Sequence, residues 1–346
     1  MRILFVGDIF GKPGRDIAKR AIPALIQRDG IDFVIANVEN AAAGFGITGE
    51  IAEAILGYGV DVMTTGNHVW DKKEILDYIP RQPKLLRPAN FPSGAPGRGS
   101  CIGRTRTGEP VGVLNLMGRI FMTPLDDPFA VALREVENLR AQARVVFVDF
   151  HAEATSEKVA MGWHLDGRAT AVSGTHTHVQ TADERLLPKG TALLTDAGMT
   201  GPHDSIIGVD VEAALGRFVT AMPAKFDSAV GGARLNAIVV TADPRTGRAT
   251  AIERLNLSAA DVEALAESQA ATSRLSECPT SSRSHSRKTT RIDARRRHGP
   301  KRARAHRQRA DGRNPPDVRD PDLATSGSRV RSPTARSGTR ATPTSR

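Results

Sequence analysis

The chain has 346 residues, of which 40% are hydrophobic, so it is long enough to bury a large core in one or two domains. Its two cysteines, Cys101 and Cys278, exclude a disulfide scaffold, and no apolar run reaches the roughly 18 residues of a membrane-spanning helix. The net charge of +10 is concentrated in residues 271–346, which hold 20 of the 48 basic and 6 of the 38 acidic residues, so residues 1–270 carry −4.

The first residues, MRILFVGDIFG, predict a β-strand rather than a secretion signal, because no small-residue cleavage site follows. With so few cysteines and no membrane span, we expect a cytoplasmic protein. Apolar runs of strand length recur along the chain, and several are apolar throughout, as in strands covered on both faces. We expect strands at residues 2–6, 32–38, 60–65, 111–116, 144–150, 170–173, 191–195 and 235–241.

Helical patterns separate several of these strands. One covers residues 16–27, with Pro23 as a kink, and three more begin at the potential capping residues Thr48, Asp127 and Asp210. Strands and helices alternate in the first half, which favours parallel pairing, and the closer spacing of the later strands favours some antiparallel pairing. The sequence therefore predicts one α/β domain over residues 1–270, with two sheets packed between helices.

Metal-capable side chains follow five of the predicted strands. Ligands of open α/β sheets bind outside the carboxyl ends of the strands, where an apolar run holds each side chain in place. A single residue of this kind is usually a turn or a cap, but five such strand ends are hard to explain as five independent turns. The residues are Asp8 in FVGD, Glu39 and Asn40 in VIANVEN, Asn67 and His68 in DVMTTGNH, His151 in VVFVDFH, and His176 and His178 in AVSGTHTH.

The HTH sequence gives the strongest local signal. Alternate residues of an extended strand point the same way, so we expect His176 and His178 to face one ion or two neighbouring ions, while Thr177 points away. Carboxylate, carboxamide and imidazole ligands without a thiolate suit manganese, iron or zinc. Two ions need a bridging ligand, for which Glu39 is the candidate because it lies in the middle of the set.

These residues together predict a hydrolytic reaction. We expect a hydroxide held between the ions to be the nucleophile, and His68 to protonate the leaving oxygen because it directly follows the ligand Asn67. The alternative for His68 is a hydrogen bonder outside the ligand shell.

Other motifs are weaker. GDIFGKPG has neither the spacing nor the Ser or Thr of a phosphate-binding P-loop, and the Gly44–Gly46 segment is not a dinucleotide fingerprint but a candidate loop close to substrate. His203 has two interpretations, a residue lining the site or part of a turn. Trp163 and His164 are expected to form a lid or a packing element.

The C-terminal segment differs in composition from the rest. Residues 271–346 are rich in Ser, Thr, Arg and Pro and nearly lack large apolar side chains, so we expect them to be disordered. A basic arm that contacts nucleic acid is one interpretation, and a solvated tail without a role in the chemistry is the favoured one, since no aromatic residues are interleaved with the charges.

Seven motifs in order resemble the YmdB-like branch of the calcineurin-like metallophosphoesterases. They are GDIFGKPGR, NVENAAAGFGIT, TTGNHVWD, RPANFP, FHAEATSEK, GTHTHVQTADE and LTDAGMTGPHDSIIG. The resemblance covers residues 1–258 and implies a four-layer α/β/β/α sandwich with a centre of two metal ions, iron or manganese. It also implies a phosphodiesterase that opens 2′,3′-cyclic nucleotides to 3′-nucleotides.

The resemblance also implies a role for each matching residue. Asp8, Asn40 and His178 would hold one ion, Asn67, His151 and His176 the other, Glu39 would bridge them, and His68 would be the proton donor. Most members of the wider superfamily have Asp-x-His at the first strand end and an Asp bridge. This chain has Asp8-Ile9-Phe10 and Glu39, as the YmdB-like branch does, so substrates of other phosphoesterases do not transfer.

Two further functions stay open at this point. A phosphomonoesterase or nucleotidase could use the same site, and an RNA-associated regulatory protein could depend on the basic tail. The sequence does not indicate an oligomeric state.

Overall fold

The computed structural model describes residues 1–276, which contain two six-stranded sheets and seven helices. The predicted boundary at residue 270 falls inside the last helix, and the remainder of the predicted tail lies outside the described residues. None of the helices in this part of the chain has the length and apolar content of a membrane span.

The first sheet has the strand order β10-β11-β1-β2-β3, with β12 paired to β11. β1, β2 and β3 are parallel, and β11 runs antiparallel to its partners β1, β10 and β12. The strands are β1 (Arg2–Val6), β2 (Phe33–Asn37), β3 (Val62–Thr64), β10 (Gly201–Pro202), β11 (Ala233–Ala242) and β12 (Ala249–Ser258).

The second sheet has the order β4-β5-β6-β7-β9-β8. Its four central strands, β5, β6, β7 and β9, are parallel, and the two edge strands are antiparallel to their neighbours. The strands are β4 (Ser100–Arg104), β5 (Pro110–Met117), β6 (Val145–His151), β7 (Ala171–Thr175), β8 (Arg185–Leu186) and β9 (Ala192–Leu194).

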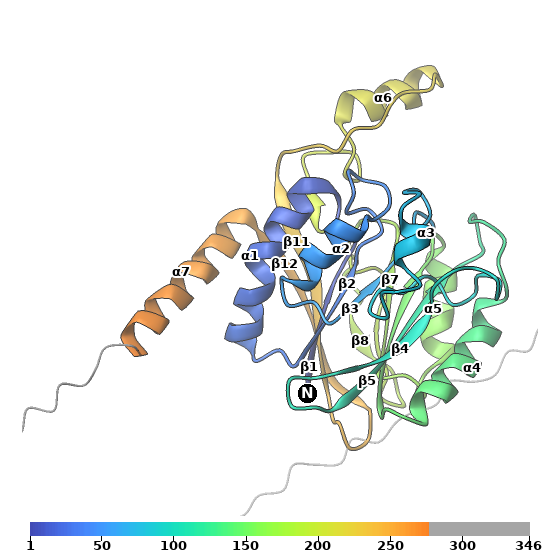
Figure 1. Ribbon diagram of the computed structural model, residues 1–346, viewed down its shortest axis with the longest axis vertical. Coiled ribbons are helices and arrows are strands. Elements are labelled where there is room, and N and C mark those ends of the chain that lie inside the picture. The colour runs from blue at the N-terminus through green and yellow to red at the C-terminus, as the bar shows by residue number, and fades with distance from the viewer. Residues whose placement is uncertain (277–346) are drawn as a thin grey trace, which may run out of the picture. The chain divides into compact units, whose positions relative to one another are not determined.

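Helices cover the outer face of each sheet (Figure 1). α1, α2 and α7 lie on the first sheet and α4 and α5 on the second, so the order of layers is helix, sheet, sheet, helix. The helices are α1 (Gly11–Asp29), α2 (Gly49–Leu56), α3 (Ile75–Tyr78), α4 (Pro128–Arg140), α5 (Thr155–His164), α6 (Val211–Thr220) and α7 (Ala259–Ser276).

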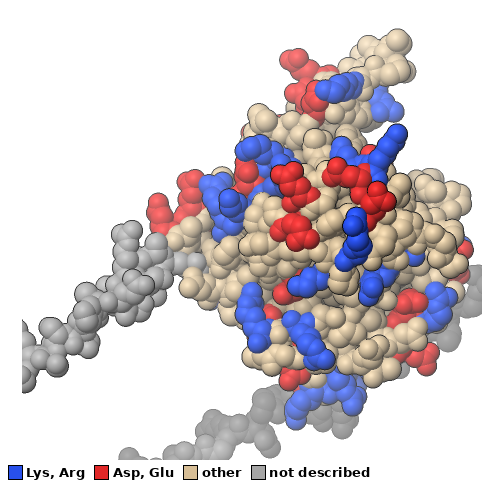
Figure 2. Space-filling model, viewed as in Figure 1, with Lys and Arg blue, Asp and Glu red and all other residues tan. Residues whose placement is uncertain are grey.

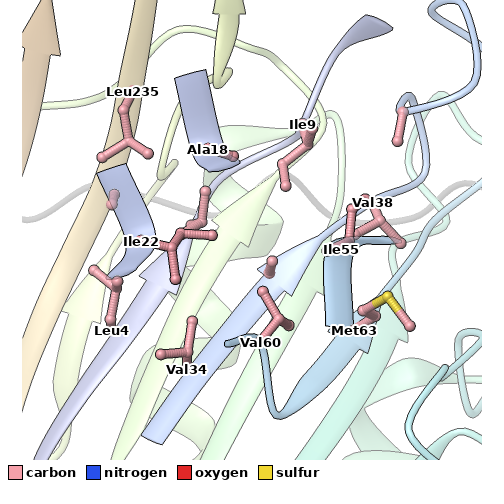
Figure 3. Close-up of a cluster of buried hydrophobic side chains, with 14 of the residues drawn as sticks. Leu4, Ile9, Ala18, Ile22, Val34, Val38, Ile55, Val60, Met63 and Leu235 are labelled. Carbon is pink, nitrogen blue, oxygen red and sulfur yellow. The ribbon is translucent and has the colours of Figure 1, made fainter. Parts of the chain in front are cut away.

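Strand β1 shows why several strands are apolar at every position. Leu4 and Val6 pack in the core beneath α1, while Ile3 and Phe5 pack in the core between the two sheets. A strand with period-two alternation and both faces covered needs apolar side chains throughout. Figure 3 shows the outer of these two cores, with Leu4 near Ile22 of α1. The four-layer α/β/β/α prediction is thereby confirmed.

All eight predicted strands occur in the structure, with ends displaced by at most two residues. The three predicted caps are also present: Thr48 Oγ1 accepts from the Ile51 amide, Asp127 from the Phe129 amide, and Asp210 from the Ala213 amide. The predicted mixture of parallel and antiparallel pairs is confirmed too. Strands β4, β8, β10 and β12 were not predicted. β8 and β10 are only two residues long, and half of the β12 side chains are polar, on a strand that pairs only with β11.

Candidate metal centre

The eight predicted site residues follow strands of both sheets at their carboxyl ends. Parallel pairing within each sheet brings these ends to one edge, where β1, β2 and β3 meet β6 and β7. Asp8, Glu39, Asn40 and His151 are at most 2% exposed, His178 is 8% exposed, and Asn67, His68 and His176 are half-buried.

One group of ligand atoms converges on the Nε2 atom of His151. This atom lies 3.0 Å from Glu39 Oε1, 2.9 Å from Asn67 Oδ1 and 3.1 Å from His176 Nδ1. One ring nitrogen cannot form good hydrogen bonds to three such atoms at once. Atoms of Glu39, His151 and His176 that can bind a metal all lie within 4.8 Å of one another, which is the spacing of ligands around a common ion.

The tautomer of His151 follows from its neighbours. The Thr175 hydroxyl donates to Asp149 Oδ1 over 2.8 Å, so its oxygen accepts from Nδ1–H of His151 over 2.9 Å. Nε2 of His151 therefore keeps its lone pair for a metal ion. This arrangement, in which an outer hydrogen bond orients an imidazole ligand, is typical of metal sites.

A second group consists of Asp8, Asn40 and His178. Asp8 Oδ1 and Asn40 Oδ1 are both buried without a hydrogen-bond partner among the described residues. The Asn40 amide nitrogen donates to Gly44 O over 2.9 Å, which directs its oxygen away from that loop. Nδ1 of His178 donates to Ile207 O over 2.8 Å and leaves Nε2 unprotonated. Buried oxygens without donors fit a cation, since leaving them unpaired is costly.

The electrostatics of the cluster favour positive charge. Burial raises the pKa of Asp8 well above its ordinary value. Burial would also raise the pKa of Glu39, but the His151 imidazole lowers it to about 2. Burial lowers the pKa of His151, yet Glu39 and Asp8 raise it to about 9. The pKa of His176 falls to about 3, through burial and the charge on His151. A metal cation beside Glu39 would supply the positive charge and leave the imidazoles neutral.

The HTH residues adopt a conformation that the sequence interpretation did not foresee. β7 ends at Thr175, and His176 and His178 have φ angles of 95° and 63°, so the expectation of an extended strand is wrong. Thr177 does point away from the imidazoles. Its hydroxyl donates to Asp196 over 2.6 Å, and Asp196 also pairs with the buried Lys158 at 2.6 Å. This buried ion pair holds the bend that presents the two imidazoles.

Gly66 is a functional position that the sequence analysis did not single out. A β-carbon at this residue would lie 2.2 Å from His151 Cδ2 and 2.4 Å from Glu39 Oε2. Only glycine lets the loop after β3 approach both side chains. The signal in the sequence was the glycine directly before Asn67, although its meaning depends on residues far along the chain.

His68 lies beside the cluster, and its ring hydrogen-bonds with Asp71. Its backbone amide donates to Glu39 Oε2 over 3.1 Å, and its Nδ1 lies 2.8 Å from Asp71 Oδ2. Its ring packs edge-on against Phe45 with centroids 5.1 Å apart. With Nδ1 held by a carboxylate, Nε2 is the ring nitrogen left for a substrate. Asp71 and Phe45 were not among the predicted site residues.

The weaker candidates have structural contacts. His203 Nε2 lies 3.1 Å from Met199 O within its own loop, and His164 Nε2 lies 3.1 Å from Phe129 O, where the two rings also pack. Trp163 is 53% exposed at the end of α5. These contacts fit the turn and packing interpretations of His203 and His164.

Comparison with known proteins identifies a family and relatives that this chain resembles over most of the described residues. A model of the family described as YmdB-like protein matches residues 4–255. The chain is 51% identical over 255 residues to the 2′,3′-cyclic-nucleotide 2′-phosphodiesterase of Bacillus subtilis, a match that covers 74% of this chain and 96% of that protein.

Solved structures share the fold. A hypothetical protein from Thermus thermophilus superimposes with a TM-score of 0.70 at 44% identity, covering 75% of this chain and 99% of that one. A novel phosphatase from Mycoplasma pneumoniae gives a TM-score of 0.70 at 33% identity, covering 75% and 93%.

Proposed function

The chain belongs to the YmdB-like protein family, and from this premise we propose that it is a two-metal phosphodiesterase that opens 2′,3′-cyclic nucleotides to 3′-nucleotides. Its relatives make it a hydrolase that acts on phosphoric ester bonds. The finer proposal is carried by one observation: metal-capable side chains from both sheets converge in a single buried site. The name of the Bacillus subtilis relative supports the substrate.

The donor set fits two cations. Buried oxygens without partners and imidazole nitrogens with free lone pairs are the ligands that iron and manganese accept. Bound ions would polarise the phosphoryl oxygens and lower the pKa of a coordinated water. In this proposal Asp8, Asn40 and His178 would hold one ion, Asn67, His151 and His176 would hold the other, and Glu39 would be shared between them.

His68 supplies the proton in the proposed reaction. A water molecule loses a proton to solvent and its oxygen bonds to phosphorus. The bond from phosphorus to the ribose 2′ oxygen breaks, that oxygen takes a proton from Nε2 of His68, and His68 regains a proton from solvent. Asp71, at 2.8 Å from Nδ1, orients the ring so that Nε2 is the nitrogen available to the substrate. The backbone amide of His68 also donates to Glu39, so the proton donor and the bridging carboxylate are held together.

Elemental analysis of the purified chain, followed by parallel assays, tests this function. We expect close to two iron or manganese ions per chain and turnover of 2′,3′-cyclic nucleotides to the 3′-monophosphate. Linear monophosphates and 3′,5′-cyclic nucleotides assayed beside them serve as controls. Hydrolysis of linear monophosphates alone would replace the proposal with a phosphomonoesterase, a second candidate that the Mycoplasma pneumoniae phosphatase favours.

The basic tail offers a separate test. Hydrolysis should be unchanged in a chain that ends at Ser276, where the described helix α7 ends. Loss of function together with a steep dependence on salt would favour the alternative of an RNA-associated protein that acts through the tail.

A further inference from the structure

The loop between β2 and α2 has a tightly held backbone over residues 40–46. Ala43, Gly44 and Gly46 have φ angles of 59°, 93° and 77°, in the left-handed region. The Ala42 amide donates to Gly46 O over 2.9 Å, and the Gly44 amide donates to Asn40 O over 3.0 Å. The side chain of Asn40, a proposed metal ligand, donates to Gly44 O over 2.9 Å. The shape of this loop is therefore fixed relative to the candidate metal centre.

Phe45 belongs to this loop, and its ring contacts the site rather than a hydrophobic core. None of the four hydrophobic clusters of the described residues includes Phe45. Its ring packs edge-on against that of His68, the proposed proton donor, with centroids 5.1 Å apart and planes at 73°. Such a contact uses at most one face of the Phe45 ring, and the residue is only half-buried. The ring therefore offers aromatic surface beside the proton donor.

Glycine at position 46 keeps the loop close to the segment that carries the proton donor. A β-carbon at Gly46 would lie 3.0 Å from Lys72 Cγ and 3.3 Å from Asp71 Cβ. Asp71 is the residue whose carboxylate lies 2.8 Å from Nδ1 of His68. Because Gly46 lacks a side chain, the loop packs against this segment and Phe45 keeps its position beside His68.

A second phenylalanine contacts the site but is buried. Phe10 packs against His178 with ring centroids 5.6 Å apart, and it is 2% exposed. Its ring can support the imidazole but cannot reach a substrate. Among the phenylalanine rings of the described residues that pack against a proposed site residue, Phe45 is the one that keeps exposed surface.

The chemistry of the proposed substrate brings its base close to Phe45. In a 2′,3′-cyclic nucleotide the leaving 2′ oxygen is bonded to C2′, and the base is bonded to the adjacent carbon, C1′. A side chain that packs against the proton donor for this oxygen is consequently near the base. Aromatic side chains are the surfaces on which proteins stack unpaired bases.

The distribution of charge favours a small nucleotide over a polynucleotide. Helices α2 and α3, which follow the loop and His68 along the chain, lie on the face shown in Figure 2. Basic and acidic side chains are interspersed over this face, whereas a polynucleotide backbone is bound along a continuous basic groove. In a cyclic mononucleotide the base is the group left for recognition beyond the ribose and the phosphate.

We propose, on the basis of the proposed function, that Phe45 stacks on the base of the substrate, so that the site selects cyclic phosphodiesters that carry a nucleobase. The base and the phosphate are then held at separate points, by Phe45 and by the metal-capable cluster. Between these points the 2′ oxygen of the ribose faces Nε2 of His68.

The test compares two probes that share the cyclic phosphate and differ in the base. They are 2′,3′-cyclic AMP and the 2′,3′-cyclic phosphate of methyl β-ribofuranoside, in which a methoxy group replaces adenine. Phe45→Ala should raise KM for the nucleotide by about 10- to 100-fold, as loss of one stacked base does, with kcat little changed. KM for the riboside should stay the same. Phe45→Tyr keeps the aromatic face and should retain the KM of the unmodified chain.

Binding of the reaction products gives a measure that does not depend on hydrolysis. By calorimetry, Phe45→Ala should weaken binding of 3′-AMP by the same factor and leave binding of methyl β-ribofuranoside 3-phosphate unchanged. Trp163→Leu changes an exposed aromatic residue at the far end of α5, and both affinities should match those of the unmodified chain. Phe45→Leu repeats the measurement with an apolar side chain, in case Phe45→Ala does not fold.

Equal losses with the nucleotide and the riboside would overturn the proposal, because Phe45 would then act only by positioning His68. Unchanged binding of 3′-AMP in Phe45→Ala would overturn it as well. If the unmodified chain hydrolyses neither cyclic probe, the proposed function fails, and the two product titrations still decide whether Phe45 binds the base.

Discussion

The two sheets contribute different chemistry to the candidate metal centre. The first sheet supplies oxygen donors, from Asp8, Glu39, Asn40 and Asn67, and the second supplies nitrogen donors, from His151, His176 and His178. Neither sheet holds a complete set. We call these the oxygen half and the nitrogen half of the site. The core between the two sheets, in which the Phe5 and Phe147 rings lie 4.9 Å apart, fixes the position of one half relative to the other.

The halves also differ in how their side chains are held. Each imidazole has one ring nitrogen engaged outside the cluster, by Thr175, Glu153 and Ile207 respectively. On the oxygen side, Asp8 Oδ1 and Asn40 Oδ1 have no partner among the described residues. The first sheet thus brings unsatisfied negative charge and dipoles, and the second brings oriented lone pairs. Preorganisation of both kinds is what a tight metal site requires.

The largest effect is expected at the residue that joins the halves. Glu39→Gln removes the charge of the proposed bridging ligand while keeping the shape of the side chain, so turnover should fall by about 10³-fold or more with the fold intact. Steady-state kinetics and thermal unfolding measure the two effects. Glu50→Gln, at an exposed glutamate of α2, is the control. Full activity in Glu39→Gln would refute the bridging role.

His68 lies beside the oxygen half, and its removal separates chemistry from metal binding. His68→Ala should lower the rate by about 10²–10³-fold, as loss of a general acid does, while two ions remain bound. Elemental analysis and kinetics on the same sample check both parts. If the ions were lost with His68, it would be a ligand and not the proton donor.

Gly66 lets the loop after β3 pack against His151 of the nitrogen half and Glu39 of the oxygen half. Gly66→Ala forces a β-carbon against His151 and Glu39, so we expect a rate loss of about 10²-fold and a lower metal content. Gly94→Ala is the matched control, because a β-carbon there meets no atom within 4 Å. Equal metal content in the two variants would show that metal binding does not depend on the close approach of the Gly66 backbone to His151 and Glu39.

Metal binding by the nitrogen half can be weakened without changing any of the proposed ligands. Thr175→Val removes the hydroxyl that links His151 to Asp149, and metal affinity should fall by about 10–100-fold. Thr175→Ser restores the hydroxyl and should recover most of the affinity. Titration of each metal-free chain with manganese measures these affinities. An unchanged affinity in Thr175→Val would show that the hydrogen bond from His151 to Thr175 does not contribute to metal binding.

The smallest effect concerns pH and the support of the HTH bend. Burial alone would raise the pKa of Asp196, but Lys158 holds it below the ordinary value in the folded chain. A lowered folded-state pKa means that the ionised carboxylate stabilises the fold above the unfolded pKa, near 4, and that this contribution is lost as pH falls through the folded pKa. The free energy of unfolding should therefore decline on acidification below about pH 4. Asp196→Asn, measured by denaturant unfolding over the same pH range, should lack this step, and an equal decline would exclude Asp196 as its source.

Sequence patterns identified the elements of this protein and the side chains at their ends. Strand β1 was readable because both of its faces are covered, which makes every position apolar. Polar residues at or just after the strand ends, among them Asp8, Glu39 and His151, stand out against these apolar runs. Local rules of this kind depend only on neighbouring residues, so the chain alone carries them.

Other features depend on contacts between distant segments. Gly66 matters because of His151 and Glu39, and the φ angles of His176 and His178 depend on a bend held by Asp196. The solvent-facing stripe of α6 has the periodicity of a buried helix, and only the fold reveals that it faces outward.

The sequence by itself determined eight of the strands, three helix caps and the oxygen and nitrogen donors offered at the strand ends. The tertiary structure alone decided which donors converge, which ring nitrogen each imidazole presents and which apolar surface stays uncovered. The physical reason is that burial and hydrogen bonding at these positions come from residues far apart in the chain, so no local pattern records them.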